Sequence, residues 1–126
     1  MAKGKDGQTD KTSLCPIKHL TNVFGGKWKL PILCILSGEP AQRYSAIKRR
    51  LGNVTDVMLS QSLHELEAAG IIHRKQFNEI PPHVEYSLTE KGKEFLPLLT
   101  QMAEWAVQDM ERVSLTPCCA QCLEME

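Results

Sequence analysis

The feature that most constrains the fold is an apolar segment, Leu30 to Leu36, that would be nonpolar on nearly every side of a helix. Such a helix must be covered by other elements, so we expect a helix from about Trp28 to Ser37 at the centre of the core. The segment is much shorter than the roughly 18 apolar residues that a membrane helix requires. Pro31 fits only in the first turn, so the helix should begin near Lys27 or Trp28.

Two further helices are expected on either side of this segment. Pro16 suits the first position of a helix with Cys15 at its N-cap, and the pair Gly25-Gly26 ends that helix. Ser45 is expected to cap a helix that reaches Leu51.

Two more helices are defined by threonine caps. Thr55 would cap a helix over 55–69 that Gly70 ends, with an apolar stripe of leucines at i, i+4 and i+7. Thr89 would cap a last helix that continues to about Val113, and Pro97 is expected to bend it.

A β-hairpin is predicted between these two helices. Its strands would be Ile71 to Phe77 and Val84 to Leu88, joined by a loop from Asn78 to Pro82 that ends in two prolines. The segment Ala41 to Tyr44 is interpreted as a short edge strand. Together these elements predict a mainly α fold with a small β-hairpin (α+β), arranged as a winged helix-turn-helix.

We expect one domain with a tail at each end. Residues 1–13 are interpreted as a disordered N-terminal tail, residues 14–113 as the domain, and residues 114–126 as a cysteine-rich C-terminal tail. The N-terminus lacks the apolar stretch of a signal peptide, so we expect a cytoplasmic protein with no membrane association.

The charge is distributed unevenly, although the formal net charge is zero. Residues 1–50 hold ten Lys or Arg and three Asp or Glu, which gives +7, whereas residues 51–126 hold five and twelve, which gives −7. This asymmetry points to a basic surface on one part of the fold, or to two solvated faces that differ in composition.

A helix-turn-helix followed by a hairpin predicts a protein that binds duplex DNA. The helix at 55–69 would enter the major groove, the hairpin would contact phosphates or the minor groove, and the preceding helix would add positive charge. The predicted DNA-binding residues are Arg43, Ser45, Lys48, Arg49, Thr55, Ser60, Gln61, His64, Arg74, Lys75 and His83.

Several motifs, in this order, resemble the HxlR family of MarR-like regulators over about residues 14–107. They are Cys15-Pro16, Gly25-Gly26-Lys27-Trp28, Leu59-Ser60-Gln61, Leu63 through Leu66-Glu67 to Gly70, Pro81-Pro82, the segment 84–92, and Ala103-Glu104-Trp105. The resemblance implies a winged-helix homodimer that represses or activates a nearby gene by binding its operator. His64 and His83 stand where the family often has a basic residue, which lowers the positive charge of the expected interface.

The resemblance also implies that the first and last helices build the dimer interface. Both carry more apolar side chains than one small domain can cover, although they could serve only the core of the monomer. The predicted interface residues are Ile17, Leu20, Phe24, Leu99, Met102, Trp105, Ala106 and Met110.

The five cysteines have different expected roles. Cys15, at a helix N-cap, is placed where backbone N–H groups favour a thiolate, and several members of the family sense electrophiles or oxidants at the matching position. The alternative is that Cys15 is a small packing residue, as Cys34 is expected to be. Three cysteines near the C-terminus are interpreted as inert, as redox partners of Cys15, or as soft-metal ligands: Cys118, Cys119 and Cys122.

Other functional classes find less support in the sequence. It contains no glycine-rich phosphate loop or metalloprotease motif, its four histidines are scattered, and we expect no enzyme activity and no cofactor. Two alternatives to a DNA-binding regulator stay open: a winged helix that binds proteins instead of DNA, and a thiol or metal sensor built on the C-terminal cysteines.

Overall fold

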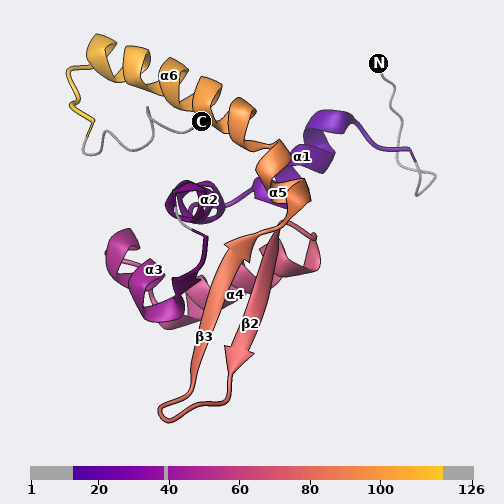
Figure 1. Ribbon diagram of the computed structural model, residues 1–126. Helices are drawn as coiled ribbons and strands as arrows, with labels where there is room; N and C mark the ends of the chain where they lie inside the picture. Colours follow the sequence, from indigo (N-terminus) through magenta and orange to yellow (C-terminus); the bar gives the residue numbers. More distant parts are fainter. Residues whose placement is uncertain (1–12, 39, 118–126) are drawn as a thin grey trace.

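The computed structural model describes residues 13–38 and 40–117, and it has the expected mainly helical architecture with one small sheet (Figure 1). The elements in chain order are α1 (Pro16–Phe24), α2 (Lys29–Ser37), β1 (Gln42–Arg43), α3 (Tyr44–Leu51), α4 (Asp56–Ala68), β2 (Ile72–Phe77), β3 (His83–Leu88), α5 (Glu90–Glu94) and α6 (Leu96–Arg112). None of the helices within the described ranges is long and apolar enough to span a bilayer. The predicted N-terminal tail and most of the C-terminal one lie outside these ranges, and the predicted domain limits stay predictions.

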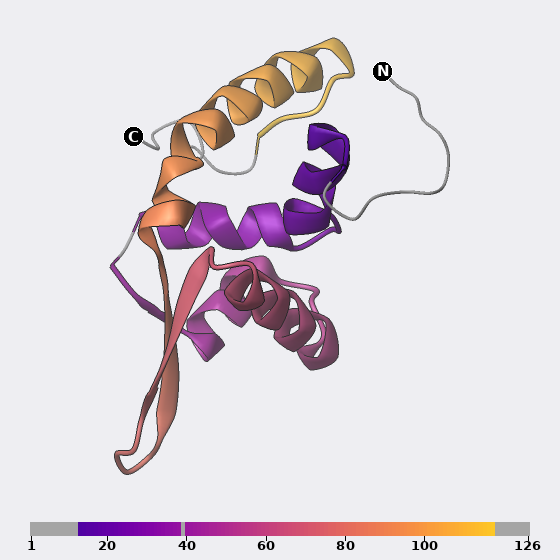
Figure 2. The same cartoon turned by 90° about the vertical axis from the view of Figure 1, so that its right-hand side faces the viewer.

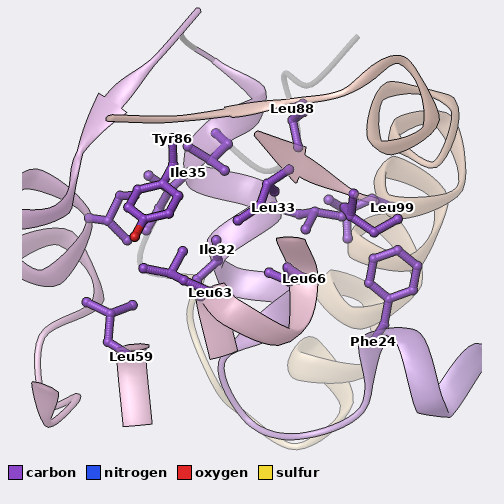
Figure 3. Close-up of a cluster of buried hydrophobic side chains, with 14 of the residues drawn as sticks. Phe24, Ile32, Leu33, Ile35, Leu59, Leu63, Leu66, Tyr86, Leu88 and Leu99 are labelled. Carbon is purple, nitrogen blue, oxygen red and sulfur yellow. The ribbon is translucent and has the colours of Figure 1, made fainter. Parts of the chain in front are cut away.

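Helix α2 occupies the centre of the core. Ile32 and Leu33 have no exposed surface, and α2 packs against α3, α4, α6 and β3. Figure 2 shows α2 between α6 on one side and the α3–α4 pair on the other. The predicted leucine stripe of α4 lies against it, since Leu59, Leu63 and Leu66 are buried in the same cluster (Figure 3).

The sheet is antiparallel, with strand order β1-β3-β2. Strands β2 and β3 form a hairpin in register from Ile72 opposite Leu88 to Phe77 opposite His83, and Gln42 and Arg43 of β1 pair with Tyr86 and Glu85. The hairpin projects from the body of the molecule as a wing, at the end opposite α6 (Figures 1 and 2).

The base of the wing is fixed to α5. Thr89 accepts a hydrogen bond from the N–H of Gly92 and donates to backbone carbonyls at the end of α4 and start of β2. Gly92 lies so close to the carbonyl of Ile71 that a Cβ atom there would collide with it. Only a glycine therefore allows this approach, which fixes where the hairpin leaves the body.

Two predicted helix boundaries were wrong. The predicted last helix is not one bent helix. It is interrupted at Phe95, and a second helix, α6, begins there with Pro97 in its first turn. A proline within a continuous helix would clash with the carbonyl four residues earlier. Ser45 lies within the first turn of α3, whose N-cap is Arg43, because β1 continues directly into this helix.

Phe24 and Leu99, which were predicted to lie in a dimer interface, are instead buried in the core of the protomer. The ring of Phe24 stacks on that of Phe95, with 4.2 Å between centroids, and so joins α1 to the start of α6. Neither residue offers apolar area to a partner.

One ion pair connects the start of α2 to the C-terminal half of α4. The ammonium of Lys29 is nearly buried and lies 2.8 Å from Oε1 of Glu65. The bond from Lys29, assisted by one from Gln61, lowers the pKa of Glu65 below its ordinary value. A buried ammonium without a partner is costly, so this pair helps to fix α4 on the core.

Replacement of Glu65 with glutamine should therefore destabilise the protein in a pH-dependent way. A carboxylate with a depressed pKa stabilises the fold above its unfolded-state pKa, and this contribution is lost as the pH falls through the folded-state pKa. Urea denaturation should show a lower free energy of unfolding for Glu65→Gln near neutral pH. The difference from wild type should shrink below about pH 4.3, the ordinary pKa of glutamate. A difference that does not change with pH would contradict this role of the pair.

Candidate nucleic-acid interface

The exposed face of α4 is opposite its leucine stripe. Val57, Ser60, Gln61 and His64 are exposed and follow i, i+3, i+4 and i+7 spacing, so they share one side of the helix. Thr55 caps the helix as predicted, because its hydroxyl oxygen accepts from the N–H of Met58 at 3.1 Å. The turn before it passes through Gly52 with a φ of +87°, a conformation that favours glycine.

A groove of about 540 Å³ lies between the start of α3, helix α4 and the wing. It brings together five of the predicted DNA-binding residues, each from a different element: Arg43, Ser45, Ser60, Arg74 and His83. Tyr44, Pro82, Val84 and Tyr86 complete its lining. The arrangement combines two guanidinium groups and two serine hydroxyls in one open concavity, and donors of these kinds bind the phosphodiester backbone.

The neighbouring cations Arg74 and Lys75 lie on opposite faces of the hairpin. Arg74 is opposite Tyr86 in the β2–β3 register and lines the groove with it. Lys75 is opposite Glu85, and its Nζ lies 5.0 Å above the ring of Phe77. Successive side chains of a strand alternate between faces, so of these two cations only Arg74 lies on the face that shares the groove with α4.

His83 is less available than the sequence suggested. Its ring stacks on Phe77 at 4.6 Å, its Nε2 lies 3.0 Å from Oε2 of Glu85, and its Nδ1 lies 3.9 Å from Oε1 of Glu79. Both ring nitrogens thus face carboxylates. His83 borders the groove, but its imidazole is engaged on the wing itself.

Tyr44 and Asp56 form a contact that the sequence analysis did not predict. The Tyr44 hydroxyl donates to Oδ1 of Asp56 at 2.9 Å and lies 3.3 Å from Oγ of Ser60, and Nζ of Lys48 lies 3.9 Å from the same Asp56 oxygen. Burial raises the pKa of Tyr44, and the charge of Asp56 acts in the same direction, so the hydroxyl stays a donor. No local pattern signals this contact, because Tyr44 and Asp56 are separated by twelve positions.

Other predicted residues do not line this groove. The Nε2 of Gln61 donates to Oε2 of Glu65 at 3.1 Å, and the same carboxylate binds Lys29 of α2. Arg49 and His64 are exposed, and Lys48 is half-buried beside Asp56.

Cys15 is an exposed free thiol at the N-cap of α1. It forms no side-chain capping hydrogen bond, but the backbone N–H groups of Lys18 and Ile17 and the charge of Lys18 lower the pKa of this thiol. Cys34 is half-buried in α2, as expected of a packing residue. Cys118, Cys119 and Cys122 lie outside the described residues, and within the part of the chain described no three His, Cys, Asp or Glu side chains are placed to hold a metal ion.

Helices α1 and α6 expose apolar side chains. Ile17 is 65% exposed, Trp105 is 62% exposed, and Leu20 and Met102 are also exposed, whereas Ala106 and Met110 are half-buried. Leu98, which the sequence analysis did not single out, adds to the exposed surface of α6.

Comparisons with known proteins agree with this arrangement. The chain matches the model of the HxlR-like helix-turn-helix family over residues 23–114. It is 44% identical over 100 residues to an uncharacterized HTH-type transcriptional regulator of Methanothermobacter thermautotrophicus, which covers 79% of this chain and 76% of that protein.

Solved structures also resemble it. The crystal structure of the HTH-type transcriptional regulator ytcD has a TM-score of 0.74 at 38% identity and covers 78% of this chain and 99% of that one. The redox regulator HypR in its oxidized form has a TM-score of 0.70 at 39% identity and covers 75% of this chain and 96% of that one. The resemblance inferred from the motifs is confirmed: the chain belongs to the HxlR-like helix-turn-helix family of transcriptional regulators.

Proposed function

We propose that this regulator binds an operator in duplex DNA as a homodimer, with α4 in the major groove and the wing beside it. The observation that carries the proposal is the groove in which Arg43, Ser45, Ser60 and Arg74 converge. Its donors suit the phosphate backbone, and the exposed face of α4 beside it suits the edges of bases. Chromosomal DNA is then the partner, and no catalytic role is assigned to any residue.

Electrostatics support the same docking. Arg43 and Arg74 line the groove with Ser60, and Lys48 lies 3.9 Å from Asp56, so three cations lie beside the N-terminal half of α4. Each phosphate that they neutralise releases condensed counterions, which makes the affinity depend on salt. The exposed residues of α4 are polar apart from Val57, Met58 and Ala68, which does not favour the alternative of a protein-binding module.

A homodimer formed through α1 and α6 accounts for their exposed apolar side chains. Ile17, Leu20, Met102 and Trp105 are exposed at the end of the molecule opposite the wing tip (Figure 1). A two-fold axis at that end would leave both wings free and place two α4 helices on successive major grooves.

Cys15 is proposed as a redox switch for this dimer, with a small oxidant or electrophile as effector. Support comes from its exposed thiol, its lowered pKa, and the similarity of the chain to HypR, which is described as a redox regulator. Oxidation would join two thiols in a disulfide, with two protons and two electrons passing to the oxidant. The candidate partners of Cys15 are those near the C-terminus, Cys118, Cys119 and Cys122.

The docking is tested by removing one cation from each face of the wing. Arg74→Ala should weaken binding equally to duplexes of random sequence and to a duplex selected from a random pool by repeated binding to the protein. It should also reduce the slope of log affinity against log salt concentration by about one, because one phosphate contact is lost. Lys75→Ala removes the same charge from the opposite face and should have a smaller effect. Fluorescence anisotropy over a salt series measures both, and equal losses in the two variants would show that the groove is not the contact surface.

The dimer interface is tested by placing a charge in its centre. Trp105→Glu should dissociate the dimer, because a carboxylate buried there would lose its hydration without a partner. Gln76→Glu adds the same charge to an exposed position on the wing, away from α1 and α6, and should leave the dimer intact. Sedimentation velocity at micromolar concentration distinguishes the two. A wild-type monomer, or a Trp105→Glu dimer as stable as wild type, would refute this interface.

The switch is tested with diamide, which oxidises thiols. Treatment should lower the affinity of the wild-type protein for its selected duplex, and dithiothreitol should restore it. Cys15→Ser should be insensitive, and Cys34→Ser should respond like wild type because Cys34 is half-buried in α2. Equal sensitivity of Cys15→Ser and wild type would assign Cys15 to packing alone.

A further inference from the structure

Val57 is the outstanding apolar residue on the exposed face of α4. Its side chain is 75% exposed, and it lies in the first turn on the same face as Ser60, Gln61 and His64. Single exposed apolar side chains are common on protein surfaces, so the exposure of Val57 does not by itself indicate a binding role. What matters is the position, because the N-terminal residues of a recognition helix are those that contact base edges.

The first turn of α4 is held firmly in place. The N-cap hydroxyl of Thr55 accepts from the N–H of Met58, and the carboxylate of Asp56 is bound by the Tyr44 hydroxyl at 2.9 Å. These contacts fix the backbone on both sides of Val57. The side chain itself is β-branched and has one strongly preferred rotamer in a helix, so little conformational entropy is lost when it is buried against a ligand.

The chemistry of valine selects what it can contact in the major groove. Its side chain has no donor or acceptor, so it cannot hydrogen-bond to any base edge or phosphate. Of the groups that base pairs present in this groove, only the C5-methyl of thymine is apolar. Polar neighbours such as Ser60 and Gln61 can satisfy the hydrogen-bonding atoms of adjacent bases.

We propose that Val57 is a specificity-determining residue that packs against the methyl group of a thymine in each half-site of the operator. This inference rests on the proposed function and adds a base preference to it. It predicts an operator with a thymine at the position that the first turn of α4 faces. Cytosine at that position would lack the C5-methyl group and would present an N4 donor in place of the O4 acceptor of thymine.

The test removes the methyl group and the side chain separately. A duplex is first selected from a random pool by repeated binding to the full-length protein, and its thymines are then replaced one at a time by deoxyuridine, which lacks only the C5-methyl. At one thymine per half-site, the replacement should weaken wild-type binding about fourfold, the factor for one buried methyl group. The same replacement should have no effect on Val57→Ala. Gln61→Ala, a control on the same face, should keep the full sensitivity.

The outcomes separate this inference from the function on which it rests. Selection that enriches no sequence would overturn the proposed function and the inference with it. An enriched sequence in which no thymine is sensitive to deoxyuridine would overturn the inference alone. So would a sensitive thymine that affects Val57→Ala as much as wild type.

Discussion

The burial of α2 is the constraint on which the rest of the structure depends. Ile32, Leu33, Ile35 and Leu36 of this helix are all buried, and α3, α4, α6 and β3 pack against it, so that only the side that carries Pro31 reaches solvent. Burial of such side chains contributes about 1.5–3 kcal/mol each. Because α4 contributes its leucine stripe to this cover, its opposite face is turned to solvent, and the candidate DNA surface follows from the packing of the core.

Two carboxylates of α4 would oppose DNA binding if they were unpaired, and the fold pairs both. Asp56 accepts from Tyr44 and lies near Lys48, and Glu65 is bound by Lys29. A carboxylate in a hydrogen-bonded pair repels a nearby phosphate less than an isolated one does. The same contacts attach the two ends of α4 to α3 and α2. They therefore offset the negative charge of the carboxylates and also hold α4 in place. The recognition helix can thus contain acidic residues and remain compatible with a polyanion.

Much of the fold could be predicted from local signals, whereas the contacts within the site could not. Caps such as Thr55 and Thr89 and the paired prolines of the wing placed the helices and the hairpin to within a few residues. The break at Phe95 and the burial of Phe24 and Leu99 depend on how α1 packs on α6, which periodicity does not encode. The pairing of Tyr44 with Asp56 likewise arises only when α3 and α4 are brought together. His83 and Glu85, by contrast, are two residues apart in β3, where side chains at that spacing share one face of the strand. Arg74 and Lys75 were both predicted to bind DNA from the hairpin, and the alternation of side chains along β2 places them on opposite faces of it.

The packing of α1 offers a physical route from the proposed switch to the proposed DNA surface. Cys15 is the N-cap of α1, and the other end of this helix carries Phe24, which stacks on Phe95 at the start of α6. Helix α1 also packs directly against α4. A disulfide at Cys15 that displaced α1 would therefore act on α4 through one contact and on the apolar face of α6 through another. Close-packed interfaces shift between discrete arrangements and do not deform continuously, so a small displacement of α1 would change the separation of two α4 helices in a dimer. In a dimer that binds two half-sites a whole number of helical turns apart, a change in that separation would weaken binding to both half-sites at once.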